Sequence, residues 1–332
     1  MKLINRLVVS SVVVITFAAA SLANAPDVRF TSGKSALNIP FKLVNNHIYL
    51  HVRVNNSEPL WFLLDTGATN IINHRHSQAL GLKLTPAGQT IGVGEGLADI
   101  FRTDNVSFSL PGITVGRQKF AVLSFDNVEE CLKKLDVDAQ GQITPRKVAA
   151  TEGQPIDGLL GGEFFRLFVV EIDYAKKTLD LHDPDDYRYQ GNGEKIPLEV
   201  TQTHIFIRTS ISASPDSAVT GRFMIDSGAA GALVLNSPFV EQNKLLPPAT
   251  ETTPFQVCGI GGDSPTQIGK VTEIRLGNIK LEKPVTMFSQ AKNGVLSSTN
   301  FSGQIGNALL RRFKVVFDYS RKVMILERAS AP

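Results

Sequence analysis

The feature that most constrains this chain is a short motif that occurs twice. Residues 61–68 read WFLLDTGA and residues 222–229 read RFMIDSGA, so each copy is an apolar stretch that leads into Asp, then Thr or Ser, then Gly and Ala. A short apolar run that ends in turn residues is typical of a buried strand. The motif therefore predicts two equivalent corners, each carrying one acidic side chain, Asp65 or Asp226, at the end of a buried strand.

Further blocks of sequence repeat in the same order around the two motifs. Residues 47–50 (HIYL) match residues 204–207 (HIFI), and residues 158–181 align without a gap with residues 303–326. Only the connections between the blocks differ in length. Two repeats of this size are typical of two domains rather than of a solenoid. We therefore predict that one structural unit is duplicated along the chain.

The predicted lobes are residues 33–190 and residues 191–328. Apolar and polar residues alternate with a period of two in several segments, for example over residues 48–54, which predicts strands. The expected fold class is mainly β, with two lobes related by a pseudo-twofold axis and with short helices.

The expected helices are few. One is predicted over residues 128–135, and one after each Asp motif, the second with Ser237 as its N-cap and Pro238 as its first residue. Residues 136–155 are polar and contain Gly and Pro, and the second half has no counterpart of equal length. We expect this stretch to be a solvated, mobile surface insertion.

Residues 1–23 are predicted to be a signal peptide. Two basic residues precede an apolar run at residues 7–20, and small residues follow. Cleavage is expected after Ala23, with Ala25 as the alternative. The apolar run is short for a membrane span, and no other run approaches about 18 apolar residues. We therefore expect an exported protein, periplasmic or secreted, without a stable membrane anchor once the signal is removed.

The net charge, the cysteines and the histidines indicate which kinds of binding site the chain is expected to lack. The formal charge of +3 falls to +1 without the two basic residues of the signal, which is not the footprint of a nucleic-acid-binding protein. Cys131 and Cys258 lie one in each half; export permits a disulfide, but free thiols remain an equal alternative. His47, His74 and His76 lie in polar stretches typical of solvated side chains. We predict no metal and no cofactor.

The residues beside each Asp suit a rigid corner. Gly67 and Gly228 permit backbone conformations and close approaches that a side chain would forbid. Thr66 and Ser227 each carry a hydroxyl. In a two-lobed assembly these hydroxyls could bond across the axis to the opposite strand and so fix the separation of the carboxylates, which would explain why Thr and Ser are interchangeable here.

Two adjacent carboxyls have a defined chemistry. If the lobes place Asp65 and Asp226 side by side, two negative charges about 4 Å apart at an effective dielectric near 20 repel by roughly 4 kcal/mol, or about three pKa units. The pair should then share one proton, and its pKa values belong to the pair. One carboxyl can accept a proton from water while the other donates one to a carbonyl oxygen.

On these residues the chain resembles the aspartic proteases, and more closely the retropepsin-like enzymes of bacteria, with two copies of the motif on one chain. Residues 258–262 (CGIGG) are similar to the retropepsin flap tip, and residues 91–94 (IGVG) are their counterpart. We name residues 91–94 the first flap segment and residues 258–262 the second. Residues 159–161 (LLG) and 304–310 (QIGNALL) are similar to the apolar-apolar-Gly element of the family. The resemblance spans about residues 35–327.

The resemblance implies an aspartic endopeptidase that hydrolyses a polypeptide or peptide substrate without a cofactor. Asp65 and Asp226 would be the catalytic residues, and Thr66 and Ser227 would support them. Because both lobes lie on one chain, a monomer suffices. The residues expected to contact the substrate are Gly67, Gly92, Val93, Gly94, Gly228, Gly259, Ile260 and Gly261.

The chain departs from the family in three places. Gln304 stands where an apolar residue is usual, and neither flap segment contains the Tyr of the pepsin branch. Ala68 and Ala229 replace the Ser common after the motif in pepsins, which removes two hydroxyls that could lower the pKa values of the carboxyls. We therefore expect a mildly acidic to near-neutral optimum.

Other functions fit parts of the pattern. A duplicated scaffold that has lost catalysis would bind peptides as an inactive pseudoprotease. A glycosidase also uses two carboxylates, but these lie about 5 to 9.5 Å apart, too far to share a proton. An Asp in this motif could also serve only to cap its own turn.

Overall fold

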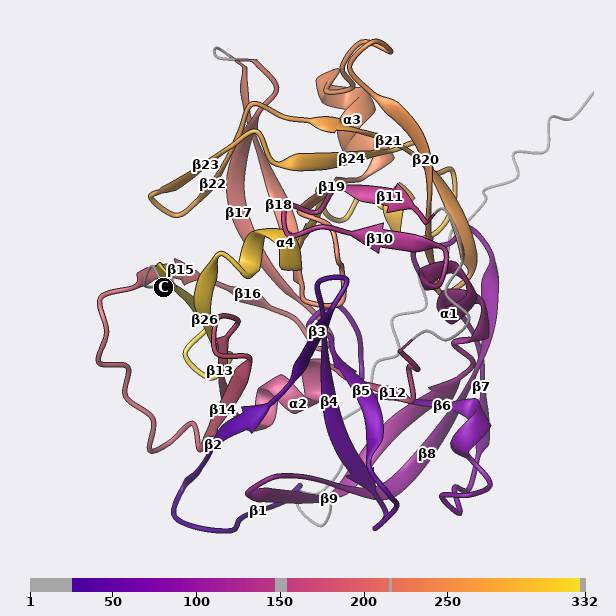
Figure 1. The fold of residues 1–332 in the computed structure, drawn as a ribbon, viewed down its shortest axis with the longest axis vertical. Helices are drawn as coiled ribbons and strands as arrows, with labels where there is room; N and C mark the ends of the chain where they lie inside the picture. The colour runs from indigo at the N-terminus through magenta and orange to yellow at the C-terminus, as the bar shows by residue number, and fades with distance from the viewer. Residues whose placement is uncertain (1–25, 147–153, 215–216, 329–332) are drawn as a thin grey trace, which may run out of the picture.

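The computed structural model describes residues 26–146, 154–214 and 217–328. The predicted signal peptide at residues 1–23, with both cleavage points, lies outside the described residues and stays a prediction. Figure 1 shows two β-rich lobes, the first in indigo to magenta and the second in orange, joined by a further sheet. The mainly β, bilobal fold expected from the sequence is confirmed.

The first lobe is one sheet that carries the first Asp motif. In spatial order its strands are β1 (Asp27–Phe30), β9 (Ile113–Leu123), β6 (Ile71–Asn73), β12 (Gly158–Leu160), β5 (Leu60–Leu64), β4 (His47–Val54), β8 (Leu97–Leu110) and β7 (Thr85–Ile91), with β3 (Lys42–Val44) beside β4. The strand that leads to the motif, β5, is therefore central.

The second lobe repeats this plan. In spatial order its strands are β20 (Thr253–Gly259), β21 (Gly262–Lys270), β24 (Val285–Ser289), β19 (Leu233–Leu235), β25 (Gly303–Gly306), β18 (Ala218–Asp226), β17 (Ile205–Ser212), β22 (Glu273–Leu276) and β23 (Ile279–Glu282), with β16 (Glu199–Val200) beside β17. The strand that leads to the second motif, β18, lies between β17 and β25 just as β5 lies between β4 and β12.

A six-stranded sheet joins the lobes and takes three strands from each half. In spatial order its strands are β15 (Glu194–Pro197), β27 (Val323–Arg328), β26 (Phe313–Asp318), β13 (Val169–Asp173), β14 (Thr178–His182) and β2 (Ser35–Pro40).

The register at the centre of this shared sheet reveals the pseudo-twofold axis. In the aligned repeats, Val170 corresponds to Val315 and Ile172 to Phe317. The antiparallel pairing of β13 with β26 matches Val170 with Phe317 and Ile172 with Val315. Exchanging the two halves therefore maps this pairing onto itself.

The helices are short, as expected, but their ends differ from the prediction. They are α1 (Asp126–Leu132), α2 (Gly162–Leu167), α3 (Ser237–Asn243) and α4 (Asn307–Leu310), with 3-10 turns η2 (His74–His76) and η3 (Val295–Ser297). The helix predicted over residues 128–135 ends early because Leu135 begins a strand. Asn236, not Ser237, is the N-cap of α3; the Ser237 hydroxyl instead donates to the carbonyl of Ala291 (2.6 Å).

The prediction of a solvated insertion at residues 136–155 is wrong for its first part. β10 (Leu135–Val137) and β11 (Ile143–Pro145) form a hairpin that lies against the second lobe (Figure 1). Ile143 is 8% exposed and belongs to an apolar cluster of the second lobe. The few apolar residues of this polar stretch pack against residues far away in sequence. The local composition therefore does not indicate that they are buried. Residues 147–153 lie outside the described residues.

The two cysteines are joined. Cys131 in α1 and Cys258 in β20 form a disulfide, with a Cα–Cα distance of 6.5 Å. The bond connects the two halves of the chain and decides between the alternatives that the sequence left open.

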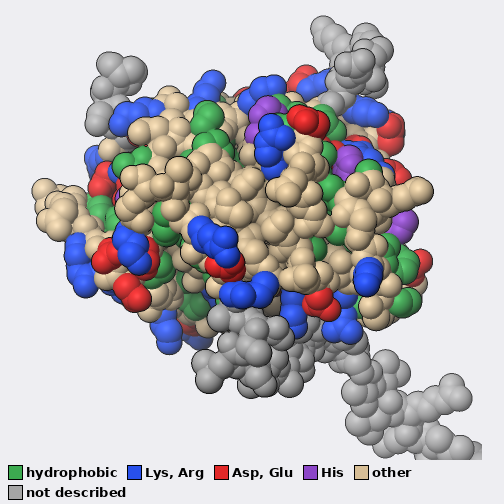
Figure 2. Space-filling model, turned by 90° about the horizontal axis from the view of Figure 1, so that it is seen from below, with side chains coloured by type: hydrophobic (Ala, Val, Ile, Leu, Met, Phe, Trp, Pro, Cys, Tyr) green, Lys and Arg blue, Asp and Glu red, His purple; other side chains and the backbone are tan. Residues whose placement is uncertain are grey.

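Surface charge is mixed on the face that Figure 2 shows, where Lys and Arg (blue) lie among Asp and Glu (red). Within the described residues, every helix is too short or too polar to cross a bilayer.

Candidate active site

The two Asp motifs meet where the lobes touch. Asp65 directly follows β5, and its backbone N–H donates to the carbonyl of Leu160 (2.9 Å). Asp226 is the last residue of β18, in register with Gly306. Asp226 is 8% exposed, and each carboxyl lies against the glycine of the other motif, close enough for the charge of Asp226 to raise the pKa of Asp65. Two side chains that are remote in sequence thus share one site.

Four reciprocal hydrogen bonds hold the motifs together. The Thr66 hydroxyl donates to the carbonyl of Ile225 (2.7 Å) and accepts from the Ser227 N–H (2.9 Å). The Ser227 hydroxyl donates to the carbonyl of Leu64 (2.8 Å) and accepts from the Thr66 N–H (2.9 Å). Thr66 and Ser227 are both buried. The cross-axis bonding expected for these hydroxyls is therefore present, and it fixes one lobe against the other.

Replacing Ser227 by Ala is expected to lower the free energy of unfolding by about 2–6 kcal/mol, because the Thr66 N–H and the Leu64 carbonyl each lose a buried hydrogen-bond partner, at about 1–3 kcal/mol each. Urea unfolding measures the change. Ser227→Thr is the matched control, since it keeps the hydroxyl and since the first motif has Thr at this position. Equal unfolding midpoints for Ser227→Ala and the wild type would contradict this role.

Glycine beside each Asp is required by the closeness of the two motifs. A Cβ on Gly67 would lie 2.6 Å from Cγ of Asp226, and a Cβ on Gly228 would lie 2.3 Å from Cγ of Asp65. Each glycine instead points its N–H to its own motif: Gly67 donates to Oδ1 of Asp65 (2.8 Å) and Gly228 to Oδ1 of Asp226 (2.9 Å). The glycines thus make room for the facing carboxyl and orient their own.

The surroundings of the two carboxyls raise both pKa values. Burial, followed by the negative charge of Asp226, raises the pKa of Asp65 well above its ordinary value. Burial also raises the pKa of Asp226, while the backbone N–H groups of Gly228 and Ala229 oppose that rise. The two carboxyls therefore favour holding one proton between them.

The two flap segments cross between the lobes and contact each other. Gly94 N–H donates to the carbonyl of Ile260 (3.0 Å), and Gly96 N–H donates to that of Gly261 (2.8 Å). A Cβ on Gly94 would lie 2.3 Å from the backbone of Gly261, and a Cβ on Gly92 would lie 2.6 Å from the Ile260 carbonyl oxygen. Glycine thus allows the two backbones to lie against each other.

The tips of the flap segments exchange lobes. Ile260 of the second segment packs on an apolar cluster of the first lobe, the cluster on which Ala68 of the first Asp motif also packs. Val93 of the first segment packs on a cluster of the second lobe and contacts Gly259. The structure therefore brings together all the flap residues singled out from the sequence; their contact with a substrate stays a prediction.

Asn307 is a site residue that sequence reasoning missed. It is fully buried and donates to the carbonyls of Ser227 (2.5 Å) and Asn46 (2.8 Å), while the Tyr174 hydroxyl donates to its Oδ1 (2.7 Å). It thereby fixes the backbone next to Asp226. In the sequence, Asn307 directly follows Gly306 of the apolar-apolar-Gly element, and this position could have identified it as a site residue.

Glu163 has a similar role in the first lobe, although in the aligned repeats it corresponds to Ala308 and Asn307 corresponds to Gly162. Its carboxylate accepts from the Thr69 hydroxyl and from the Asn70 N–H (2.8 Å). Each motif loop is thus held by the residues that follow the apolar-apolar-Gly element of its own half.

The histidines considered as metal ligands lie apart. Burial lowers the pKa of His47 to about 4, and the ring faces the backbone of Gly228. His74 and His76 lie in η2, where His76 Nε2 lies 2.7 Å from Asp157 Oδ1. Within the described residues, groups close enough to hold a metal are Cys131, Cys258 and Asp263, and Glu171, Asp180 and His182. In the first group, the two cysteines are joined in the disulfide. In the second group, the Glu171 carboxylate is paired with Lys314, whose Nζ lies 2.5 Å away.

Comparison with known proteins agrees with this geometry. The family model of aspartyl proteases matches residues 50–164 and 213–307, more than half of the chain and one stretch around each Asp motif. A comparison with curated proteins gives no match. The chain therefore belongs to the aspartyl protease family.

Proposed function

We propose that this protein is an aspartic endopeptidase that cleaves peptide bonds with Asp65 and Asp226. The observation that carries the proposal is the pair of carboxyls that face each other across the two motif glycines, held at the contact of the lobes by Thr66 and Ser227. Membership of the aspartyl protease family supports it.

The rise in pKa, which is larger for Asp65, assigns the roles in this proposal. The charged Asp226 accepts a proton from a water molecule as the water oxygen attacks the carbonyl carbon of the peptide bond. Asp65 donates its proton to the carbonyl oxygen, which gives a neutral tetrahedral intermediate without a covalent bond to the enzyme. In the second step Asp226 passes its proton to the amide nitrogen, the C–N bond breaks, and Asp65 takes the proton of one hydroxyl of the intermediate, which becomes the product carboxyl. The substrate lies extended and pairs with flap backbone as an added strand.

The rate should depend on pH as a bell. Activity falls at low pH as Asp226 is protonated and at high pH as Asp65 loses its proton. Because the pKa of Asp65 is raised and Ala68 and Ala229 offer no hydroxyl to the carboxyls, kcat/KM should peak between mildly acidic and neutral pH. A profile of kcat/KM against pH measures this, and a peak at about pH 2–3, below the ordinary carboxyl pKa values, would contradict it.

Two other functions fit parts of the site. A glycosidase needs carboxyls about 5–9.5 Å apart, whereas the close approach of each motif glycine to the facing carboxyl and the effect of the Asp226 charge on the pKa of Asp65 favour a closer pair. An inactive peptide-binding protein would keep the same lobes and flap segments. Turnover distinguishes the latter from a protease.

The test is digestion of a mixed peptide library with mass-spectrometric detection of new termini. The proposal expects new termini with the wild type, and none with Asp226→Asn or with an aspartic-protease inhibitor. Peptide binding without new termini would favour the inactive scaffold.

We also propose that the protein acts as an exported monomer after loss of residues 1–23. Both catalytic aspartates lie on one chain, and a disulfide suits an oxidising compartment. N-terminal sequencing of the exported protein tests the cleavage point, and light scattering tests the monomer.

A further inference from the structure

The disulfide ties a flap segment of one lobe to the body of the other. Cys258 directly precedes Gly259 at the tip of the second flap segment, and Cys131 lies in α1 of the first half. Their Cα atoms are 6.5 Å apart. The tip of the second flap segment, which belongs to the second lobe, is therefore covalently bound to the first lobe.

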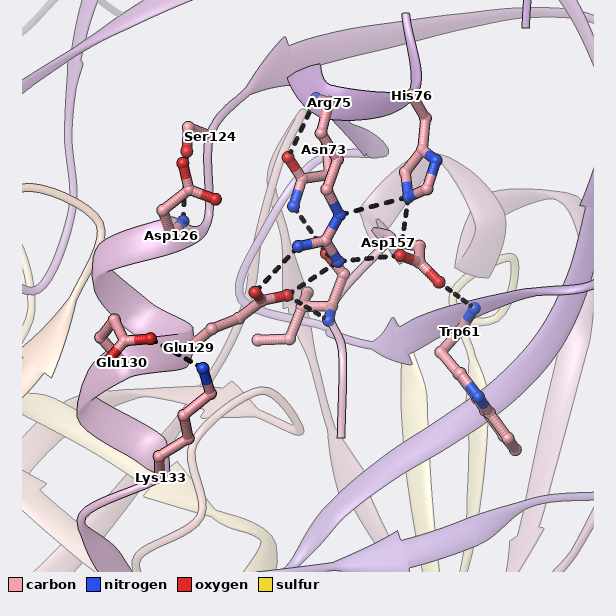
Figure 3. A network of polar contacts seen from close by, with 11 residues as sticks. Trp61, Asn73, Arg75, His76, Ser124, Asp126, Glu129, Glu130, Lys133 and Asp157 are labelled. Carbon is pink, nitrogen blue, oxygen red and sulfur yellow. Dashed lines mark hydrogen bonds and ion pairs between the residues drawn. The ribbon is translucent and has the colours of Figure 1, made fainter. Parts of the chain in front are cut away.

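Helix α1 is a firm attachment point. Arg75 donates to both carboxylate oxygens of Glu129 in α1 (2.8 and 2.9 Å) and to Oδ1 of Asp157 (2.8 Å). The Ile156 N–H donates to the same Glu129 carboxylate (2.6 Å). Figure 3 shows Arg75 between Glu129 and Asp157. The Cys131 end of the bond is thus fixed to the first lobe.

The first flap segment has no such bond. Where the second segment has Cys258, the first has Ile91, which is 46% exposed. Besides its bonds to the second flap segment, it is joined to the second lobe by hydrogen bonds from Val295 N–H to the Gly92 carbonyl (2.9 Å) and from Lys292 N–H to the neighbouring Glu95 carboxylate (2.7 Å). Such bonds exchange readily with water, whereas a disulfide must be cleaved chemically. The pseudosymmetric flaps therefore differ in how they can open.

We propose that Cys131–Cys258 is a redox latch that keeps the second flap segment closed, and that its reduction lets the segment lift and admits polypeptide chains. The proposal rests on the proposed function, because only a protease must pass a chain beneath the flaps. With the bond intact the segment moves only together with α1. Without it, only noncovalent contacts oppose opening among the described residues: the hydrogen bonds that Gly94, Glu95 and Gly96 donate to the second flap hairpin, the contact of Val93 with Gly259, and the packing of Ile260.

The reaction is thiol–disulfide exchange with a dithiol reductant. A thiolate of the reductant attacks one sulfur and forms a mixed disulfide, and the other protein sulfur leaves and takes up a proton. The second thiol of the reductant then attacks the mixed disulfide and releases the remaining protein thiol. Two electrons pass to the protein, and the reductant leaves as a disulfide. Cys131 and Cys258 are both partly exposed, so a reductant can reach them.

Hydrogen exchange tests the latch without requiring catalysis. The amides of Gly94 and Gly96 donate to the second flap segment, and reduction by a phosphine with EDTA present should speed their exchange at least about tenfold, as expected for local opening. Cys131→Ser and Cys258→Ser should give the same increase, and the reductant should add nothing in either variant. Amides of β26 in the shared sheet should not change, which separates local opening from global unfolding.

Cleavage tests the consequence. The rate on an unfolded, cysteine-free protein should rise about tenfold on reduction and in both Ser variants, with a smaller rise for a short peptide, since lid opening limits the larger substrate more. Unchanged exchange at Gly94 and Gly96, with both thiols shown free by mass, would overturn the latch. Faster exchange without cleavage in any state would instead refute the proposed function.

Discussion

Replacing Asp65 or Asp226 by Asn is expected to lower kcat/KM for peptide cleavage by at least about 10³-fold, and by as much as about 10⁵-fold, while the fold is kept. Asn has nearly the shape of Asp and can still accept the N–H of Gly67 or Gly228. It cannot take a proton from water or hold the shared proton. Steady-state kinetics on a peptide found in the library digest measures the loss.

The matched control is Asp104→Asn, because Asp104 is an exposed aspartate of β8. Its kcat/KM should equal that of the wild type. The kcat/KM of the double Asn variant should lie within a few-fold of that of the less active single variant, since the two carboxyls act as a unit. Substantial activity in either single variant would refute the role of the pair.

The free energy of unfolding should not fall in Asp65→Asn, although its activity does. In the folded protein the pKa of Asp65 is raised, so the native state binds this proton more tightly than the unfolded chain does. The stabilisation is complete below the unfolded pKa, about 4, and is lost as pH rises through the folded value. Asp65→Asn removes that loss, so at neutral pH the variant should unfold at a urea concentration equal to or above that of the wild type.

Replacing Gly228 by Ala is expected to lower kcat/KM by about 10²-fold or more, because a small misplacement of reacting groups has an effect of this size. The new Cβ would lie 2.3 Å from Cγ of Asp65, so the carboxyl or the loop must move. Gly67→Ala should act in the same way through Asp226, whose Cγ would lie 2.6 Å away.

Gly116→Ala is the control for this prediction. A Cβ on Gly116 in β9 would lie 3.5 Å from its nearest neighbour, an ordinary contact. Its activity and stability should therefore stay close to those of the wild type. If Gly228→Ala were as active as Gly116→Ala, the close approach of the two motifs would not matter for catalysis.

The sequence predicted the parts of the site that repeat. Each Asp follows an apolar strand and precedes a hydroxyl and a glycine, and these local patterns determine both the corner and its partner across the axis. The bonds of Thr66 and Ser227 could be expected before the fold was known because one requirement, contact with the opposite strand, applies to both halves.

The features that sequence reasoning missed depend on contacts between segments far apart. The hairpin of β10 and β11 is polar overall, yet Leu135, Val137 and Ile143 pack on an apolar cluster of the second lobe. Ser237 has the sequence position of an N-cap, but its hydroxyl donates to the carbonyl of Ala291, which is far away in sequence. The pairing of Cys131 with Cys258 depends on where the second flap segment lies, which the local sequence does not determine.

NMR titration of the two carboxyl carbons would show whether Asp65 and Asp226 share one proton. With ¹³C-labelled Asp and the two Asn variants for assignment, we expect two separate steps, the upper one well above the ordinary carboxyl range, because burial and the charge of Asp226 raise the pKa of Asp65. In Asp226→Asn, the upper step should move down, since the neighbouring charge is gone. Two carboxyls that titrate together at about pH 4, unchanged by the loss of either partner, would refute the shared proton.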